Sequence, residues 1–241
     1  MMYQLTGNAV KSIPEKISNN VRFIQRNGDD CLVVSFSAFT SFGQEQKYNY
    51  INSISSKNAL LSFLDTNTPL NDPRGTYYLN FADNDLFSYI KSAGTIIDSV
   101  AKENKIPKEK IYIIGSSKGA VGALLCSFVC HYDNVIINAP QFRIGSYVKR
   151  RSTEILESML SMYDLKYLDN IMNDVIIKSE KQPNNIVITC GIDDLYHIKE
   201  LNMYEELFIS KRITYNKIIF SGGHDNESIL NYRAIIDKII P

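Results

Sequence analysis

Short runs of apolar residues recur along the chain, separated by segments in which apolar residues return every three or four positions. The runs have the length and β-branched composition of buried strands, whereas the spaced segments are typical of amphipathic helices. The predicted strands are Cys31–Phe36, Ala59–Leu64, Lys110–Ile114, Asn134–Asn138, Asn185–Cys190 and Asn216–Phe220, with Val21–Gln25 as an N-terminal edge strand. The predicted helices are Asp85–Lys105, Lys118–His131, Leu195–Ser210 and Ser228–Ile239. This alternation predicts an α/β protein with a mostly parallel sheet flanked by helices.

One segment, at about 140–183, interrupts the alternation. It carries two helical patterns, around Thr153–Tyr163 and Tyr167–Ile177, and a basic cluster that precedes them. The basic cluster consists of Arg143, Lys149, Arg150 and Arg151. A helical insertion between two core strands predicts a lid over the carboxyl edge of the sheet, where open α/β sheets bind ligands. We therefore expect a single domain spanning 1–241 with this lid inserted.

The composition is that of an ordinary globular protein. The chain has 241 residues, of which 44% are hydrophobic and 22% are charged, which suits one α/β domain and argues against disorder. Lys and Arg total 26, as do Asp and Glu, so no overall field attracts nucleic acid. Residues 1–7 lack the pattern of a signal peptide, and no apolar run reaches the ~20 residues that span a bilayer. We expect a cytoplasmic protein without a transmembrane segment, and its oligomeric state stays open, a homo-oligomer included.

The most informative motif is Gly115-Ser116-Ser117-Lys118-Gly119. It lies between a predicted strand and a predicted helix. A G-x-S-x-G sequence in that context holds a serine on a sharp turn with its hydroxyl exposed. Ser117 is therefore the candidate nucleophile, with an ordinary tight turn as the alternative. The motif is not a phosphate-binding loop, which needs G-x-x-x-x-G-K-[ST].

A serine nucleophile needs a base, and the chain contains three histidines. His224 follows the last predicted strand in a glycine-rich loop, which lets its side chain reach over the sheet edge toward Ser117. His131 is expected at the end of a helix, as a surface or capping residue. His197 follows the same strand as the candidate acids and is placed to flank the site, but its helical position suits packing better. His224 is thus the candidate base.

The acid that orients this base is expected after the preceding strand, in the chain order Ser, Asp, His. Asp193 and Asp194 both lie there. The spacing from Gly191 favours Asp194, but either aspartate can instead cap the helix that begins near Leu195. The choice between the two stays open. Asp225 is less suitable, because neighbouring residues seldom reach each other's ring nitrogen.

An oxyanion intermediate needs two preorganised N–H donors. The N–H of Lys118, directly after the nucleophile, is one candidate. The loop after the strand Cys31–Phe36 supplies the other, with Phe39 favoured and Ala38 second, and the Ser37 hydroxyl is a further candidate. The Lys118 side chain is unexpected beside a catalytic serine. It either pairs with a carboxylate that holds the turn or faces an anionic ligand.

Several short motifs resemble those of bacterial capsular-polysaccharide biosynthesis proteins of the α/β-hydrolase fold, a group that includes capsule O-acetyltransferases. The motifs are Phe36–Phe39, Arg74–Leu79, Gly115–Gly119, Ala139–Phe142 and Gly223–His224. The resemblance implies an α/β-hydrolase fold and the transfer of an acetyl group from acetyl-CoA to a sugar hydroxyl. It also implies an acetyl-serine on Ser117, with His224 as the base and Asp194 as the acid. Ala38 stands where glycine is expected.

Three functions are compatible with these residues. The first is a serine-dependent O-acetyltransferase acting on a capsular or surface polysaccharide, with acetyl-CoA as cosubstrate. In that case Arg143, Lys149 and Arg150 are candidates to contact CoA phosphates or an anionic glycan, although a basic helix face is often simply solvated. The second is a carboxylesterase or carbohydrate deacetylase with the same triad, because water then replaces the sugar. The third is a non-catalytic protein that kept the fold.

We expect no metal and no bound cofactor. The three histidines are scattered along the chain, and no H-x-x-x-H or H-E-x-x-H motif occurs. The four cysteines, Cys31, Cys126, Cys130 and Cys190, lack metal-like spacing, and three of them fall in predicted core elements.

Overall fold

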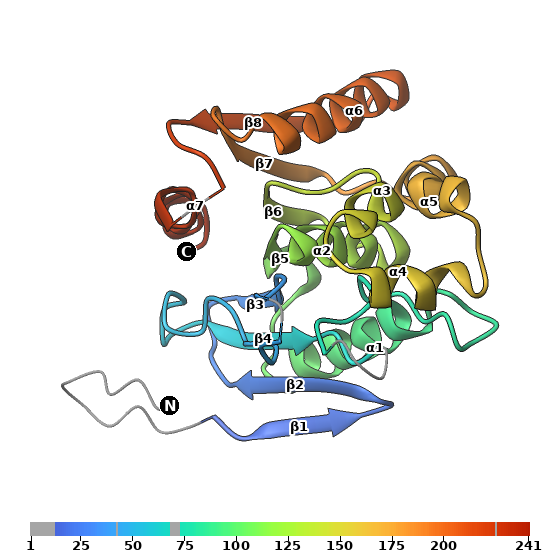
Figure 1. Ribbon diagram of the computed structural model, residues 1–241. Helices are drawn as coiled ribbons and strands as arrows, with labels where there is room; N and C mark the ends of the chain where they lie inside the picture. The colour runs from blue at the N-terminus through green and yellow to red at the C-terminus, as the bar shows by residue number, and fades with distance from the viewer. Residues whose placement is uncertain (1–12, 42, 68–72, 225) are drawn as a thin grey trace.

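A single mixed sheet of eight strands runs through the computed structural model, which describes residues 13–41, 43–67, 73–224 and 226–241. The strand order is β1-β2-β4-β3-β5-β6-β7-β8 (Figure 1). The strands are β1 (Glu15–Ser18), β2 (Val21–Arg26), β3 (Leu32–Phe36), β4 (Ala59–Leu64), β5 (Ile111–Ser116), β6 (Asn134–Asn138), β7 (Asn185–Gly191) and β8 (Tyr215–Phe220). All the predicted strands are present, with ends that differ by at most two residues.

The strands from β3 to β8 are parallel to their neighbours, and β2 joins them antiparallel to β4. Every residue of β3, β4 and β6 is buried, as expected for strands covered on both faces. The prediction that Val21–Gln25 forms the edge was wrong, because β1 pairs outside it. The hairpin turns at Asn19 and Asn20, both with positive φ, and the exposed β1 has no apolar pattern that would have predicted it.

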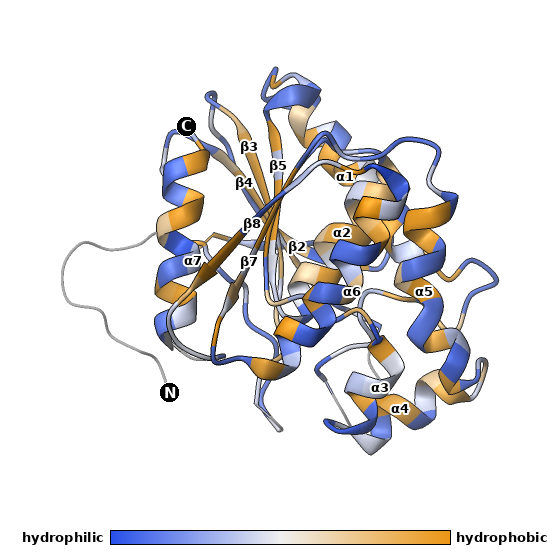
Figure 2. Ribbon diagram, turned by 90° about the horizontal axis from the view of Figure 1, so that it is seen from above, coloured by the Kyte–Doolittle hydropathy of each residue, from blue (hydrophilic) through white to orange (hydrophobic). Residues whose placement is uncertain are grey.

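Helices cover both faces of the sheet. Figure 2 shows α1, α2, α5 and α6 on one side and α7 on the other. The helices of the core are α1 (Ser88–Glu103), α2 (Lys118–Cys130), α6 (Leu195–Lys211) and α7 (Asn226–Ile239), and a short 3-10 helix spans Lys108–Lys110. The larger apolar cluster joins the sheet to α1, α2 and α6, whereas Tyr232, Ile236 and Ile240 of the α7 end pack on the opposite face. This is the α/β-hydrolase arrangement that the sequence predicts.

The segment between β6 and β7 is helical, as predicted. It contains α3 (Ile144–Lys149), α4 (Thr153–Leu160) and α5 (Leu165–Lys178). The side chains of Ser152 and Asp164 cap α4 and α5 at their N-termini. The sequence did not predict α3, which has only six residues. The assignment of the segment as a lid on a single domain stays a prediction.

Two sequence-based expectations fall on residues 1–7 and on Asp225, which lie outside the described residues. Within the described part of the chain, no helix is both long and apolar enough to cross a membrane. The four cysteines are unpaired, and Cys31, Cys126 and Cys190 are buried. The candidate catalytic residues all follow the carboxyl ends of strands, so the topology gathers them along one edge of the sheet.

Candidate active site

Ser117 lies on the sharp turn between β5 and α2. Its backbone has φ 54° and ψ −124°, a region that non-glycine residues occupy only under strain. The glycines of the motif are required by close packing. A Cβ at Gly115 would collide with the Gly119 carbonyl, and one at Gly119 would collide with the Phe36 carbonyl. The structure therefore holds Ser117 in the strained turn that the motif predicts.

The Lys118 side chain is fully buried beneath this turn. Its Nζ forms an ion pair with Asp65 Oδ2 at 3.2 Å and donates to the Arg74 carbonyl at 2.5 Å. Asp65 also accepts a hydrogen bond from the Tyr78 N–H at 2.9 Å. Burial raises the pKa of Asp65 despite the adjacent ammonium group. The sequence left two roles open for Lys118. The structure shows the first, in which the side chain pairs with a carboxylate.

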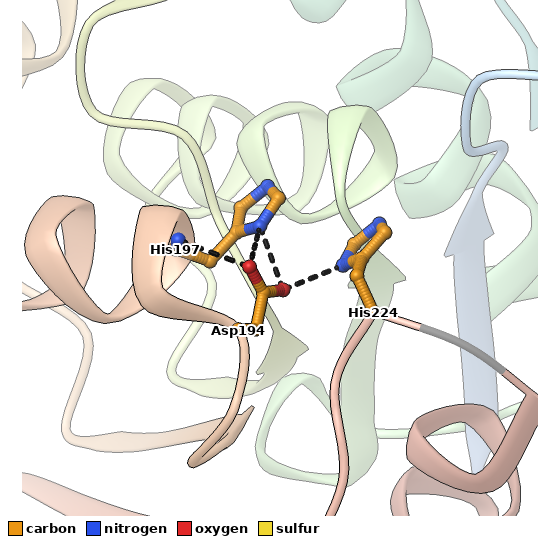
Figure 3. Close-up of side chains that lie close together, drawn as sticks. All are labelled: Asp194, His197 and His224. Carbon is orange, nitrogen blue, oxygen red and sulfur yellow. Dashed lines mark hydrogen bonds and ion pairs between the residues drawn. The ribbon is translucent and has the colours of Figure 1, made fainter.

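Asp194 lies between two histidines, His197 and His224 (Figure 3). His224 Nδ1 is 2.9 Å from Asp194 Oδ2, and His197 Nδ1 is 2.7 Å from the same oxygen and 2.8 Å from Oδ1. The two imidazole rings stack with centroids 4.4 Å apart. Asp194 also caps α6 by accepting the His197 N–H. The geometry thus favours Asp194 over the exposed Asp193, and Asp194 serves both as cap and as histidine partner.

The electrostatics of this cluster favour a charged Asp194 beside a neutral His197. Burial alone raises the pKa of Asp194, but the hydrogen bonds from His197 and His224 outweigh it and hold that pKa well below its ordinary value. Burial lowers the pKa of His197, although its hydrogen bond to Asp194 opposes the shift. A neutral His197 that donates from Nδ1 leaves its Nε2 as an acceptor.

Of the two placements that the sequence left open for His197, packing and a position beside the site, the structure shows the second. His197 is buried within the site and reaches Ser117 through Gln141, a residue that the sequence analysis did not assign a role. Gln141 Nε2 lies 2.7 Å from His197 Nε2 and donates to Ser117 Oγ at 3.0 Å. His131 is the C-cap of α2 in the left-handed conformation, as predicted.

The same cluster has the residue types of a metal site. Potential ligand atoms of Asp194, His197 and His224 lie within 4.8 Å of one another. Both imidazole Nδ1 atoms, however, already lie at hydrogen-bond distance from the carboxylate. The hydrogen bonds account for the arrangement without a metal ion.

Ser117 and His224 line one cavity of about 660 Å³. Among the described residues, no hydrogen bond joins Ser117 Oγ to His224, and Gln141 is the partner of that oxygen. Catalytic hydrogen bonds of this kind are often long in a free enzyme and shorten when substrate binds. The side chain of His224 is 38% exposed, whereas that of His197 is buried.

The loop after β3 lies beside the nucleophile, as predicted. The Ala38 N–H donates to Asn49 Oδ1 at 2.8 Å, and the Ser37 hydroxyl donates to the Phe63 carbonyl at 2.7 Å. Because these groups are engaged, the Phe39 N–H stays the favoured candidate donor in this loop. The Phe39 ring packs edge-on against Tyr77, with centroids 5.3 Å apart, which fixes the loop.

The basic residues divide into those that line the cavity and those that do not. Arg143 binds Glu200, whose side chain is fully buried, at 2.6 Å and does not line the cavity, and neither does Lys149. Arg150 does line it, and its guanidinium lies 3.8 Å from the centre of the Tyr196 ring. The other arginines that line the cavity are Arg74, Arg151 and Arg233. Arg74 and Arg233 are far from the basic cluster in sequence, so that cluster could not have indicated them.

Comparison with solved structures gives close matches over the whole chain. The capsule O-acetyltransferase of Neisseria meningitidis serogroup A is 40% identical, with a TM-score of 0.88, over 98% of this chain and 97% of that one. This chain belongs to the family of that capsule O-acetyltransferase. A histidine-to-alanine variant of the meningococcal enzyme, in complex with CoA, matches at 38% identity and a TM-score of 0.89 over 98% of both chains. The prediction of an acyltransferase from this family is therefore confirmed.

More distant structures share only the fold of the capsule O-acetyltransferase family. The Staphylococcus aureus serine hydrolase FphF is 13% identical, with a TM-score of 0.67, over 95% of this chain and 97% of that one. A ferulic acid esterase is 11% identical, with a TM-score of 0.61, over 95% of both chains. These matches confirm the predicted α/β-hydrolase fold. No protein-family model and no curated protein matches the chain.

Proposed function

We propose that the protein is a serine-dependent O-acetyltransferase that moves an acetyl group from acetyl-CoA to a sugar hydroxyl of a capsular or surface polysaccharide. The observation that carries the proposal is the placement of Ser117 and His224 in one cavity, with His224 bound to Asp194. Membership of the capsule O-acetyltransferase family supports the reaction class, and the CoA complex of the meningococcal relative supports the donor. Since acetyl-CoA is made inside cells, the proposed donor implies a cytoplasmic reaction.

In the first half-reaction, His224 takes the proton from Ser117 Oγ, and this oxygen attacks the thioester carbonyl of acetyl-CoA. Asp194 stabilises the imidazolium that forms. The N–H groups of Lys118 and Phe39 are the proposed donors to the oxyanion. Collapse of the intermediate breaks the carbon–sulfur bond, and His224 returns the proton to the CoA thiolate. The products are CoA and acetyl-Ser117.

In the second half-reaction, a sugar hydroxyl takes the place of CoA. His224 accepts the hydroxyl proton while the sugar oxygen attacks the acetyl carbon, and the same two N–H groups stabilise the second oxyanion. Ser117 Oγ then leaves and recovers a proton from His224. The sugar carries the acetyl group away, and the enzyme returns to its starting state.

The arginines of the cavity suit an anionic substrate group. Arg150 and Arg151 directly follow α3, Arg74 donates to the Arg151 carbonyl at 3.5 Å, and Arg233 comes from α7. Guanidinium groups bind phosphates with paired, charge-assisted hydrogen bonds. We assign the phosphates of CoA to this cationic part of the cavity, with Arg150 as the best-placed residue of the predicted basic cluster.

Hydrolysis by the same residues is the alternative function. The exposed side chain of His224 gives water access to the base, and a water molecule in place of the sugar would make the protein an esterase or deacetylase. The two functions share the first half-reaction and differ only in the acceptor.

The test follows the fate of the acetyl group. Labelled acetyl-CoA is incubated with the protein, with and without a polysaccharide fragment, and the label is quantified as acetate and as acetylated sugar. Transfer predicts that added acceptor speeds CoA release and moves the label to the sugar. Release of acetate at an unchanged rate, with no label on any sugar offered, would contradict the transferase and favour the esterase.

A further inference from the structure

A continuous chain of hydrogen bonds leads from Asp194 to Ser117 without passing through His224. It passes through the buried side chains of His197 and Gln141. His197 Nδ1 lies 2.8 Å from Asp194 Oδ1, His197 Nε2 lies 2.7 Å from Gln141 Nε2, and Gln141 Nε2 lies 3.0 Å from Ser117 Oγ. The proposed acetyl transfer, on which this inference rests, gives His197 and Gln141 no role so far.

The donors and acceptors of this chain are fixed by one another. Asp194 accepts at both oxygens, so His197 must donate from Nδ1. A neutral His197 then has only an acceptor at Nε2, and Gln141 must turn its NH₂ group toward it. The Gln141 amide oxygen faces the Tyr77 hydroxyl, which donates to it at 3.5 Å. The second hydrogen of the amide nitrogen then faces Ser117 Oγ at 3.0 Å and the Ala139 carbonyl at 3.3 Å, and Ser117 is the nearer of the two acceptors.

The backbone of Gln141 is held as firmly as its side chain. The Tyr204 hydroxyl donates to the Gln141 carbonyl at 2.8 Å, and the residue is fully buried. Its amide nitrogen also lies 3.3 Å from the Ala139 carbonyl. A rotation of the amide group is therefore the main freedom left to this side chain, and His197 decides its outcome.

We propose that His197 is a positioning residue that keeps Gln141 as a hydrogen-bond donor to Ser117. A donor on one lone pair of Oγ leaves the serine hydrogen for His224 and the other lone pair for the acetyl carbon. The same donor stabilises the negative charge that builds up on Oγ when acetyl-Ser117 is cleaved. His224 moves the proton, and His197 with Gln141 orients the oxygen.

Protonation of His197 reverses this arrangement. A charged ring carries a hydrogen on Nε2, which faces the NH₂ group of Gln141, so the amide has to rotate and present its oxygen. Ser117 Oγ then meets an acceptor and donates its own hydrogen to Gln141 rather than to His224. The groups that face His197 are Asp194 and His224, the ring of Tyr147 from α3, and Tyr196 and Glu200 from its own helix.

The test compares the rate of acetyl-Ser117 formation in the parent and in three variants, with acetyl-CoA as the probe and quenched samples analysed by intact mass. Gln141→Met removes both N–H groups, and His197→Phe removes the acceptor. Each should slow acetylation about 10-fold, the effect of one lost hydrogen bond to a reacting oxygen. His197→Gln can place an amide oxygen near the former Nε2 and should stay within about threefold of the parent.

The pH profile separates positioning from a merely structural role. On a logarithmic scale the parent rate should fall more steeply with decreasing pH once His197 is protonated, because Ser117 Oγ then loses its hydrogen-bond donor. His197→Gln should keep the shallower slope throughout. His131→Asn, which removes a distant imidazole at a left-handed position that asparagine tolerates, should keep the parent profile.

Thermal unfolding of every variant reports whether it has folded. Parent-like rates in folded Gln141→Met and His197→Phe would overturn the inference and leave the acetyl transfer intact. A His197→Gln variant as slow as His197→Phe would also overturn it, since the acceptor at Nε2 would then not be what matters. A parent that never gains an acetyl group would overturn the proposed function together with this inference.

Discussion

The floor of the active site and its rim are built in different ways. The floor consists of Ser117 on its turn and the Lys118–Asp65 pair beneath it, all of them buried. The rim carries His224 and Arg150, both exposed. The reacting atoms thus lie in a fixed, low-dielectric network, whereas the groups proposed to exchange protons and bind charge have access to solvent.

This difference separates two kinds of change. A substitution in the floor should act on chemistry or on stability, because each side chain there is held by several buried partners. A substitution on the rim should change substrate affinity, and the size of this change should depend on salt concentration, because exposed charges are screened. Asp194 and His197 connect the two regions, since Asp194 binds both a buried and an exposed histidine.

The largest effect is expected at Asp194. Asp194→Asn removes the charge that stabilises the His224 imidazolium and should reduce the acetylation rate about 10⁴-fold, as for other triads that lose their acid. The measurement is the rate of CoA release in a single turnover. Asp193→Asn, a change at the exposed neighbour, is the matched control and should keep the parent rate. Equal losses in the two variants would contradict the assignment of Asp194.

The next effect concerns stability. Lys118→Met leaves the Asp65 carboxylate buried without its counter-charge, which should lower the free energy of unfolding by about 3–5 kcal/mol. Urea denaturation measures it. Replacing Asp65 by leucine in the same variant should recover part of the loss. The exposed pair Lys181–Asp133 provides the control, since Lys181→Met should cost less than about 1 kcal/mol. A small loss for Lys118→Met would mean that the pair does not brace the turn.

A smaller effect is expected on the rim. Arg150→Ala should raise the KM for acetyl-CoA about 10-fold at low salt, with less difference at high salt, because a charge-assisted contact to a phosphate is lost. Lys149→Ala removes the same charge from a neighbouring position that does not line the cavity, and its KM should stay near that of the parent. Initial rates at two salt concentrations decide between them. An equal rise in KM in both variants would show that these positive charges act through long-range electrostatics and not through a contact at a binding site.

The smallest effect is a pH dependence of stability caused by His197. Burial holds its folded pKa below the ordinary value of 6.5, so the unfolded chain binds this proton more readily. The contribution of His197 to the free energy of unfolding is complete above pH 6.5 and is lost as the pH falls toward the folded pKa. Asp194 changes the free energy of unfolding only at lower pH, below its unfolded pKa near 3.8. Urea denaturation at pH 7.5 and 5.5, values chosen at about one unit on either side of 6.5, should show a decrease in the parent that His197→Gln removes. An equal decrease in both proteins would contradict the assignment.

The sequence predicted Ser117 and the residues placed by strand order better than their buried partners. Ser117 and its glycines form a local motif whose conformation follows from steric limits on a few neighbouring residues. The chain order of strands then placed Asp194 and His224 at the same edge of the sheet. Asp65 and Gln141 could not be assigned in this way, since nothing near them in sequence signals a partner more than 20 residues away.

For His197 and Arg143, too, the local sequence suggested a role that differs from the one in the structure. A helical position suggested packing for His197, but the cap formed by Asp194 turns its ring into the site. A basic cluster suggested a ligand contact for Arg143, but Glu200 on a distant helix binds its guanidinium. Both outcomes depend on how α6 packs against the segment after β6, which periodicity along the chain does not encode.

The most direct test of the account is the intact mass of the protein after incubation with acetyl-CoA, followed by mapping of the modified peptide. The account predicts one acetyl group on Ser117 in the parent and in Ser116→Ala, and none in Ser117→Ala. An adduct of equal amount in Ser117→Ala, or one that maps to another residue, would contradict the claim that Ser117 carries the acetyl group.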